Sequence, residues 1–211
     1  MKISVGIPHQ HREEAAALYW EAFGDKLGFV LGPKYRAIRF ISAVLRADHG
    51  VCAHDDSGRL VGVAGFKTVQ GALVGASFHD LRRVYGWTGA AIRVALLAAL
   101  ETDTENERFL MDGLFVAEEA RGQGVGTALI DAITAEAKRR GYRQIRLDVV
   151  DTNKRAKALY LRRGFYELRT QSIGVMRHVF KFRTATSMVR DIYPEPISAP
   201  AAKTSAPPST T

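Results

Sequence analysis

The chain has 211 residues, of which 46% are hydrophobic and 25% are charged. This composition is typical of a soluble globular protein and excludes a disordered polyelectrolyte, a collagen-like repeat and a disulfide scaffold. The net charge is +8, because 30 Lys and Arg residues stand against 22 Asp and Glu residues. A solvated basic face and a surface that attracts phosphates are both compatible with this charge.

The single cysteine, Cys52, cannot form an intrachain disulfide and favours a reducing cytoplasm. Residues 1–6 lack the apolar run of a secretory signal. The most apolar helical stretch, residues 90–100, is interrupted by Arg93 and is too short to cross a bilayer. We therefore predict a cytoplasmic protein that does not enter a membrane.

The hydrophobic pattern predicts one mixed α/β domain over residues 1–193. The predicted elements, in chain order, are a strand at 2–7, a helix at 9–23, a helix from Pro33 to residue 45, strands at 51–54 and 59–69 joined by a turn at 55–58, helices at 78–85 and 90–101, a strand at 109–116, a helix at 127–140, a strand at 144–150, a helix at 155–162, and strands at 165–170 and 184–192. From residue 109 onward, the order of strand, glycine turn, helix and strand requires a parallel pair with a right-handed crossover.

Residues 194–211 contain five of the seven prolines and no aromatic residue. Such a segment cannot bury enough apolar surface to offset the entropy lost on ordering. We expect this segment to be a disordered tail.

The most informative stretch is a glycine loop between the strand at 109–116 and the helix that follows. Gly122, Gly124 and Gly126 occupy alternate positions. Glycine lets the backbone approach a ligand closely, and a helix start offers N–H groups and a positive dipole end to phosphate. The loop therefore predicts a pyrophosphate site, and a tight turn that binds nothing is the alternative. A Walker loop is excluded because no lysine follows Gly126, and a dinucleotide fingerprint is excluded by the glycine spacing.

Two motifs of the chain resemble the GNAT family of N-acetyltransferases. Residues 121–126, Arg-Gly-Gln-Gly-Val-Gly, fit the Q/R-x-x-G-x-G/A motif that binds acyl-CoA in that family. Residues 153–165 match the family pattern N-x-x-A-x-x-L-Y-x-x-x-G-F. The motifs come in the family's order, separated by one helix and one strand. The resemblance covers residues 109–168 closely.

The resemblance implies an α/β fold with a mixed, mostly antiparallel central sheet and helices on both faces. One parallel strand pair would splay to hold acyl-CoA, with acetyl-CoA as the co-substrate and no metal. The backbone of Phe115 and Val116 would pair with the pantetheine arm, and Asn153 would hydrogen-bond near it, although an ordinary helix N-cap also explains that asparagine. The residues that the resemblance assigns to cofactor binding are Phe115, Val116, Arg121, Gly122, Gln123, Gly124, Val125, Gly126, Thr127, Asn153 and Tyr160.

Tyr160 matches the family tyrosine that lies beside the cofactor sulfur. An amine attacks the thioester and a thiolate must leave, so a proton donor is needed there. A phenol with a pKa near 10 stays protonated at neutral pH and can supply that proton. The alternative is a packing role for a half-buried aromatic ring.

The group that takes the proton of the attacking amine is less constrained by the sequence. Asp112 is the candidate base, because an acid is often found near this strand position in the family. By the period of two, Asp112 lies on the same side as Leu110 and Leu114. Burial would raise its pKa toward a useful value, and a structural hydrogen bond is the alternative role. His54 and His79 are further candidates for this base.

The resemblance thus implies an enzyme that moves an acetyl group from acetyl-CoA to a primary amine of a small molecule or peptide. A catalytically silent acyl-CoA-binding module is the alternative. No recognised motif of aromatic and basic residues indicates a nucleic-acid partner. The acidic stretch 101–119 favours a cationic acceptor. Many family members have a short hairpin where this chain has residues 70–108, which we interpret as a helical insertion. The insertion would either cover the acceptor site or form a homodimer contact.

Overall fold

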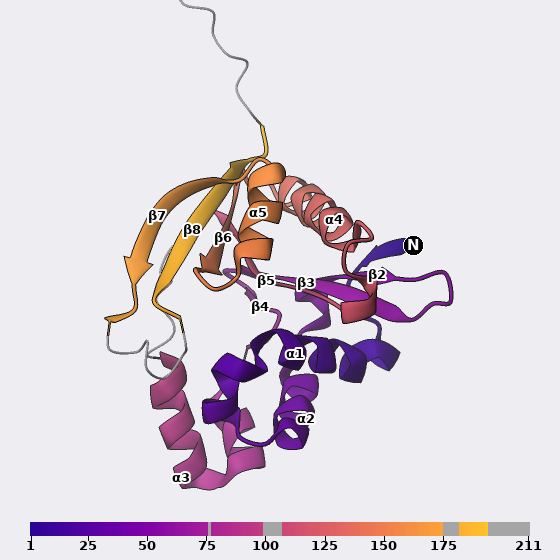
Figure 1. The fold of residues 1–211 in the computed structure, drawn as a ribbon. Helices are drawn as coiled ribbons and strands as arrows, with labels where there is room; N and C mark the ends of the chain where they lie inside the picture. Colours follow the sequence, from indigo (N-terminus) through magenta and orange to yellow (C-terminus); the bar gives the residue numbers. More distant parts are fainter. Residues whose placement is uncertain (76, 99–106, 175–181, 194–211) are drawn as a thin grey trace, which may run out of the picture.

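The computed structural model describes residues 1–75, 77–98, 107–174 and 182–193 (Figure 1). The predicted tail at 194–211 and the last residues of the predicted helix at 90–101 lie outside the described residues. No helix in the described part of the chain is long and apolar enough to cross a membrane.

The described strands form one sheet, in the order β1-β2-β3-β5-β6-β8-β7, with β4 paired to β3. The strands are β1 (Lys2–Val5), β2 (Gly50–His54), β3 (Leu60–Thr68), β4 (Gly71–Ala72), β5 (Phe109–Val116), β6 (Gln144–Val150), β7 (Tyr166–Ser172) and β8 (Thr184–Asp191). Every neighbouring pair is antiparallel except β5 and β6, which are parallel. The predicted mixed, mostly antiparallel sheet is therefore confirmed.

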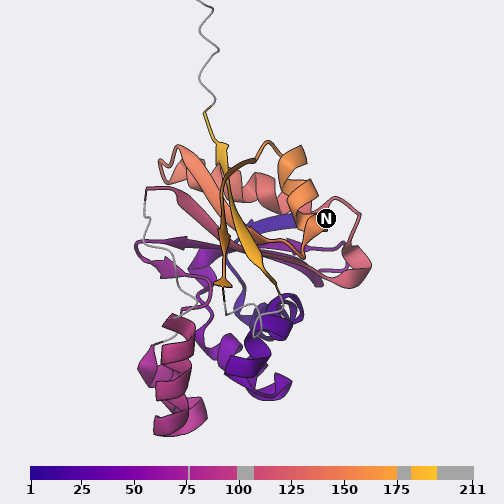
Figure 2. The ribbon, with the colours of Figure 1, turned by 60° about the vertical axis from the view of Figure 1, so that its left-hand side comes forward.

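Helices cover both faces of this sheet. They are α1 (Arg12–Leu31), α2 (Lys34–Val44), α3 (Phe78–Ala98), α4 (Val125–Arg139) and α5 (Lys154–Arg162). In both ribbon views α4 and α5 lie on one face, whereas α1 and α2 lie on the other and α3 lies beyond them (Figures 1 and 2). The main core fills the space between the sheet and α4, and a second core joins α1, α2 and α3.

Helix α1 is longer than the sequence pattern predicts, since it continues past Phe23 to Leu31. The predicted end at residue 23 was therefore wrong, and the helix continues through Gly24 and Gly28. In the structure a β-carbon at Gly24 would lie 2.9 Å from Cε2 of Trp20, so the small residue makes room for the indole one turn earlier. Val30 and Leu31 are buried in the second core, and this burial offsets the low helix propensity of glycine.

The insertion forms the short strand β4 and the helix α3. This helix contains a break at Gly86, whose φ of 72° is accessible to glycine. The break accounts for the two separate helical patterns in the sequence. Leu81 and Ala90, one on each side of the break, are both buried against α1 and α2. The insertion is therefore anchored on the helical face of α1 and α2.

The parallel pair β5–β6 is joined only at its beginning. The registered pairs are Phe109 with Ile145 and Leu110 with Arg146, and the two strands then diverge. Each strand keeps a full ladder on its other side, β5 with β3 and β6 with β8. The sheet thus opens toward the carboxyl ends of β5 and β6, while the pairing within each half of the sheet stays intact.

Candidate active site

A cavity of about 560 Å³ lies where the sheet opens. This volume is typical of a site for a small organic ligand or cofactor. Its lining comes from α1, the end of β5, the glycine loop and the start of α5: Leu18, Glu21, Ala22, Leu114, Phe115, Val116, Ala120, Arg121, Gly122, Gly124, Val125, Gly126, Thr127, Asn153, Arg155, Ala156, Leu159 and Arg162.

The glycines of the loop are required for two different reasons. Gly122 and Gly124 both have φ of 83°, in the left-handed region that favours glycine. A β-carbon at Gly124 would meet no atom within 4 Å, so the backbone there borders open space. A β-carbon at Gly126 would instead lie 3.1 Å from Cδ2 of Leu159, so Gly126 lets α4 approach α5 closely.

Two side chains of the motif hold the loop in place. The guanidinium of Arg121 donates to the carbonyl oxygen of Val116 over 3.2 Å. The amide of Gln123 donates to the carbonyl oxygen of Glu119 over 2.7 Å. Both side chains are thus used to fix the backbone, so the backbone N–H groups of the loop are held in place.

The electrostatics of the cavity favour an anion. Gly124 is the N-cap of α4, so the first N–H groups of this helix, beginning at Val125, have no partner within it. These groups and the positive end of the helix dipole face the loop. Arg121, Arg155 and Arg162 add three guanidinium groups to the lining. A diphosphate is a ligand of matching charge and geometry.

The edge of β5 offers backbone hydrogen bonds to the opening. The N–H of Ala117 donates to the carbonyl oxygen of Val61 over 2.9 Å, and Phe115 is registered with Val63. Hydrogen-bonded pairs alternate along an antiparallel ladder, so the N–H and C=O of Phe115 point to β3. The backbone groups of Leu114 and Val116 point the other way, toward the gap. The expectation that the backbone of Phe115 faces the gap is therefore wrong, whereas Val116 is placed as expected.

The side chain of Asn153 has two roles. Its side-chain oxygen accepts from the N–H of Ala156 over 3.1 Å, as an N-cap of α5 does. It also lines the cavity. The N-cap that the sequence left as an alternative is therefore present, and the side chain still borders the ligand space.

Asp112 occupies a β-bulge. Gly65 is registered with Gly113 and Phe66 with Met111, which leaves Asp112 as the extra residue of β5. The bulge reverses the alternation of side chains. The side chain of Leu114 is on the α4 side of the sheet, near Gly126. The side chain of Asp112 is on the α1 side, where its charge raises the pKa of Tyr19. The prediction that Asp112 and Leu114 share one side of the strand is therefore wrong.

Asp112 as a whole residue is exposed, but protein atoms surround its carboxyl on most sides. This desolvation raises the pKa of Asp112 to about 7, against the opposing effects of a hydrogen bond from the N–H of Leu73 and the charge of Lys67. A carboxyl that titrates near neutral pH is suited to take and release a proton there.

Tyr19 is a site residue that the sequence did not reveal. Burial and the nearby charge of Asp112 raise the pKa of Tyr19 above that of a free phenol, so it stays protonated. Its ring packs on Phe23 at 4.9 Å and on Phe115 at 5.4 Å between centroids. In the sequence Tyr19 is one more aromatic residue of an amphipathic helix, and nothing in the spacing connects it with Asp112.

Tyr160 is a core residue of α5 with 7% of its surface exposed. Its ring lies 5.8 Å from that of Phe165, and burial raises the pKa of Tyr160 to about 12. Ala156 and Leu159 of the same helix line the cavity, but neither Tyr160 nor Asp112 does so in the described structure. The predicted cofactor residues line this one cavity, except Gln123 and Tyr160, and the two predicted catalytic residues lie outside its lining.

Cys52, His54 and His79 lie away from the cavity lining. Cys52 is fully buried in the main core, and desolvation raises the pKa of its thiol to about 12. His54 packs on the ring of His11, and His79 is exposed in the first turn of α3. Within the described ranges, no three His, Cys, Asp or Glu side chains are placed to hold a metal ion.

Comparison of the sequence with models of protein families agrees with this fold and cavity. Residues 12–165 match the family model described as the acetyltransferase (GNAT) family. The match includes β5, the glycine loop, α4, β6 and α5. The chain therefore belongs to the GNAT family of acetyltransferases.

The curated relatives are similar to this chain over part of their length. A thialysine N-epsilon-acetyltransferase of Bos taurus is 39% identical over 72 residues, which are 34% of this chain and 41% of that protein. Its counterpart in Mus musculus is 37% identical over 71 residues, with the same two shares of 34% and 41%. The similarity thus spans about two-fifths of these relatives.

Two solved structures have the same fold at low sequence identity. The first, described as an acetyltransferase, superposes with a TM-score of 0.62 at 18% identity and covers 92% of this chain and 100% of its own. The second, a ribosomal-protein-alanine N-acetyltransferase from Brucella melitensis, has a TM-score of 0.60 at 16% identity and covers 90% and 99%. At these identities the similarity concerns the fold.

Proposed function

We propose that this chain transfers an acetyl group from acetyl-CoA directly to a primary amine, in the cytoplasm. The observation that carries the proposal is the opening between β5 and β6, which leads from free strand edges to a glycine loop with a positive charge. A ligand with an amide-containing arm and a diphosphate would use both parts of that cavity.

The residues of the cavity fit such a ligand. The N–H groups of residues 121–127 would hold the diphosphate, with the guanidinium groups of Arg155 and Arg162 nearby. The free edge at Leu114 and Val116 would pair with the amides of the arm. Phe115 would contribute its ring, which packs between Tyr19 and Phe23 on the α1 side.

When bound, acetyl-CoA supplies an acetyl group activated as a thioester. In the proposed reaction the carboxylate of Asp112 takes the proton from the nitrogen of the amine. Tyr160 holds a phenolic proton at neutral pH and would give it to the departing sulfur. The protonated phenol of Tyr19 would stabilise the charged carboxylate of Asp112. A base that titrates at about pH 7 works efficiently near neutral pH.

The acceptor that we propose is a primary aliphatic amine at the end of a flexible chain, on a small molecule or a peptide. The printed activity of the curated relatives, acetylation of the epsilon nitrogen of thialysine, supports this class. The carboxylate of Asp112 supports it as well, because an ammonium group is cationic before it loses its proton.

The test is a pair of measurements on one preparation. Calorimetry with acetyl-CoA should give saturable binding at one site per chain. A free-thiol assay should then show release of CoA that depends on an added amine, with thialysine, lysine, spermidine and an alanine-terminated peptide as the panel. Binding without thiol release for any amine would favour the silent module, and the lack of acetyl-CoA binding would contradict the proposal.

A further inference from the structure

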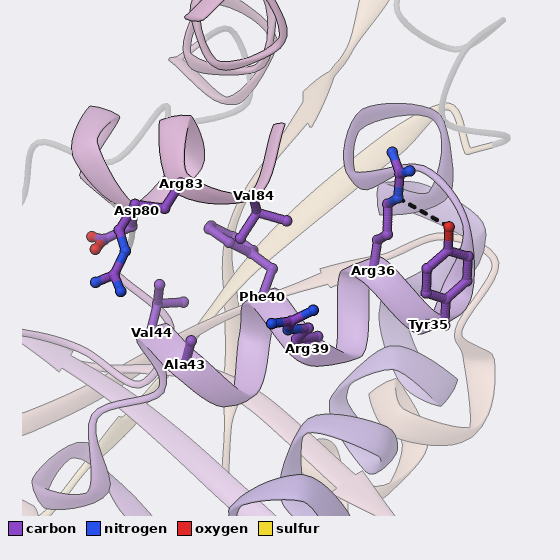
Figure 3. Close-up of a pocket in the computed structure, with 9 residues that line it drawn as sticks. All are labelled: Tyr35, Arg36, Arg39, Phe40, Ala43, Val44, Asp80, Arg83 and Val84. Carbon is purple, nitrogen blue, oxygen red and sulfur yellow. Dashed lines mark hydrogen bonds between the residues drawn. The ribbon is translucent and has the colours of Figure 1, made fainter. Parts of the chain in front are cut away.

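A second cavity, of about 600 Å³, lies between α2 and α3 on the helical side of the domain (Figure 3). Its lining comes only from these two helices, with six of the nine residues from α2 and three from α3. It shares no residue with the cavity at the glycine loop. The proposed acetyl transfer gives this second cavity no role.

The floor of this groove is apolar. Phe40 of α2 is 2% exposed and lies beside Val84 of α3, and Val44 and Ala43 continue the same surface (Figure 3). An apolar floor between two helices offers a place for aliphatic or aromatic side chains of a ligand.

The rim of the groove is positively charged. Arg36 and Arg39 project from α2 and Arg83 projects from α3, and all three are exposed. The one carboxylate in the lining, Asp80, accepts from the hydroxyl of Ser77 over 2.6 Å and from the N–H of Ser77 over 3.0 Å. These hydrogen bonds at the start of α3 lower the pKa of Asp80 and both end on its Oδ2.

Two of the three guanidinium groups of the rim are available to a ligand, since Arg36 donates to the hydroxyl of Tyr35 over 3.0 Å (Figure 3). Arg39 and Arg83 form no side-chain hydrogen bond or ion pair with any described residue, although Arg83 lies close enough to Asp80 to lower its pKa. Some other arginines of the described chain are instead held by hydrogen bonds. Arg12, for example, donates to the carbonyl oxygens of Ser42 and Leu45. Free guanidinium groups around an apolar floor are suited to carboxylates that flank apolar side chains.

From this arrangement we propose that the groove between α2 and α3 docks an acidic polypeptide segment in which carboxylates alternate with apolar side chains. The carboxylates bind Arg39 and Arg83 from the two sides, and the apolar side chains cover Phe40 and Val84. An acidic peptide fits better than a nucleic acid, because its apolar side chains can cover the apolar floor, which offers nothing to a phosphate backbone.

The test uses the full chain and a fluorescein-labelled hexapeptide of alternating glutamate and leucine, with fluorescence anisotropy at low salt. We expect saturable binding that weakens at least tenfold in R39E and in R83E, and at least tenfold when glutamine replaces glutamate in the peptide. Ala43→Trp, which fills the groove and changes no charge, should also weaken binding at least tenfold.

Arg143→Glu is the matched control. Arg143 is exposed and follows α4, so this variant makes the same change of charge outside the groove. Its affinity should stay within twofold of the unmodified chain. Lack of saturable binding, or an equal loss in Arg143→Glu and R39E, would overturn the proposal. Tighter binding of a single-stranded oligonucleotide with the same dependence on Arg39 would overturn it in favour of a nucleic-acid site.

Discussion

A β-carbon built on Gly65 of β3 would lie 2.5 Å from Oδ1 of Asp112 in β5. The same β-carbon would lie 2.6 Å from Cδ2 of Leu73, whose backbone N–H donates to that carboxyl. The missing side chain at Gly65 therefore makes the space in which the proposed base sits. Gly65 and Asp112 lie in different strands and are 47 positions apart in the sequence.

Gly65→Ala should displace the carboxyl of Asp112 by direct contact. We expect the turnover number for the acceptor amine to fall at least tenfold, while the affinity for acetyl-CoA stays within threefold. Overpacking should also lower the free energy of unfolding by about 1–3 kcal/mol. Steady-state kinetics, calorimetry and urea unfolding on one preparation measure the three quantities.

Gly50→Ala is the control for Gly65→Ala. Its β-carbon would lie 2.9 Å from Cδ1 of Ile7 and 3.1 Å from Cδ1 of Leu73, a similar clash that does not touch Asp112 itself. It should lower stability to a comparable extent and leave the turnover number within twofold. Equal losses of turnover in both variants would mean that overpacking alone causes the defect.

The pH dependence follows from the raised pKa of Asp112, about 7. Because the amine needs the ionised carboxylate, kcat/KM should fall below pH 7 with an apparent pKa near that value. Asp112→Asn should lower the rate at pH 8 by roughly 100-fold and remove this acidic limb. A profile that keeps the same limb in Asp112→Asn would assign it to another group.

The same pKa has a consequence for stability. An Asp in the unfolded chain titrates near 3.9, so between pH 4 and pH 7 the unfolded chain has lost a proton that the folded chain retains. Raising the pH through this window therefore favours the unfolded state at this residue. Asp112→Asn should gain in melting temperature relative to the unmodified chain as the pH rises from 4 to 8. Thermal melts at both pH values measure the difference.

The glycine loop can be tested with a pair of nearly isosteric variants. Gly124 has φ of 83°, which Asn and Asp tolerate better than other residues with side chains. Gly124→Asp adds a negative charge to the proposed diphosphate site, whereas Gly124→Asn adds a neutral group of the same size. Calorimetry should show at least tenfold weaker binding of acetyl-CoA in Gly124→Asp than in Gly124→Asn. Equal affinities would contradict a diphosphate at this loop.

Tyr160→Phe removes only the hydroxyl of the proposed acid. The ring still packs on Phe165, so the free energy of unfolding should change by no more than about 1 kcal/mol. We expect the turnover number to fall roughly 100-fold and the affinity for acetyl-CoA to stay within a few-fold. If turnover stays within threefold while product release does not limit the rate, Tyr160 is a packing residue.

The sequence predicted most of the elements around the cavity. The bounds of β5 and β6 agree with the prediction, and α4 and α5 differ from it by one or two residues. These elements are short, their apolar faces repeat clearly, and the two helices are followed by Gly141 and Gly164. The resemblance to the GNAT family, carried by residues 121–126 and 153–165, also predicted the splayed strand pair.

The remaining features depend on contacts between distant parts of the chain. The bulge at Asp112 arises from pairing with β3, and a period of two within one strand cannot reveal it. The length of α1 depends on the fit of Trp20 against Gly24. The position of Tyr19 near Asp112 joins α1 to β5 and has no signature in either segment. Tertiary packing decided each of these features.

The most direct test of the central proposal is the mass of the amine product. Thialysine and lysine are incubated with acetyl-CoA and the full chain at pH 8, and the amines are analysed by mass spectrometry. We expect a product that is heavier by one acetyl group on its terminal amine, formed much faster than without protein and strongly reduced by Gly124→Asp. An unmodified amine throughout the panel, with a folded chain that binds acetyl-CoA, would contradict the proposed transfer.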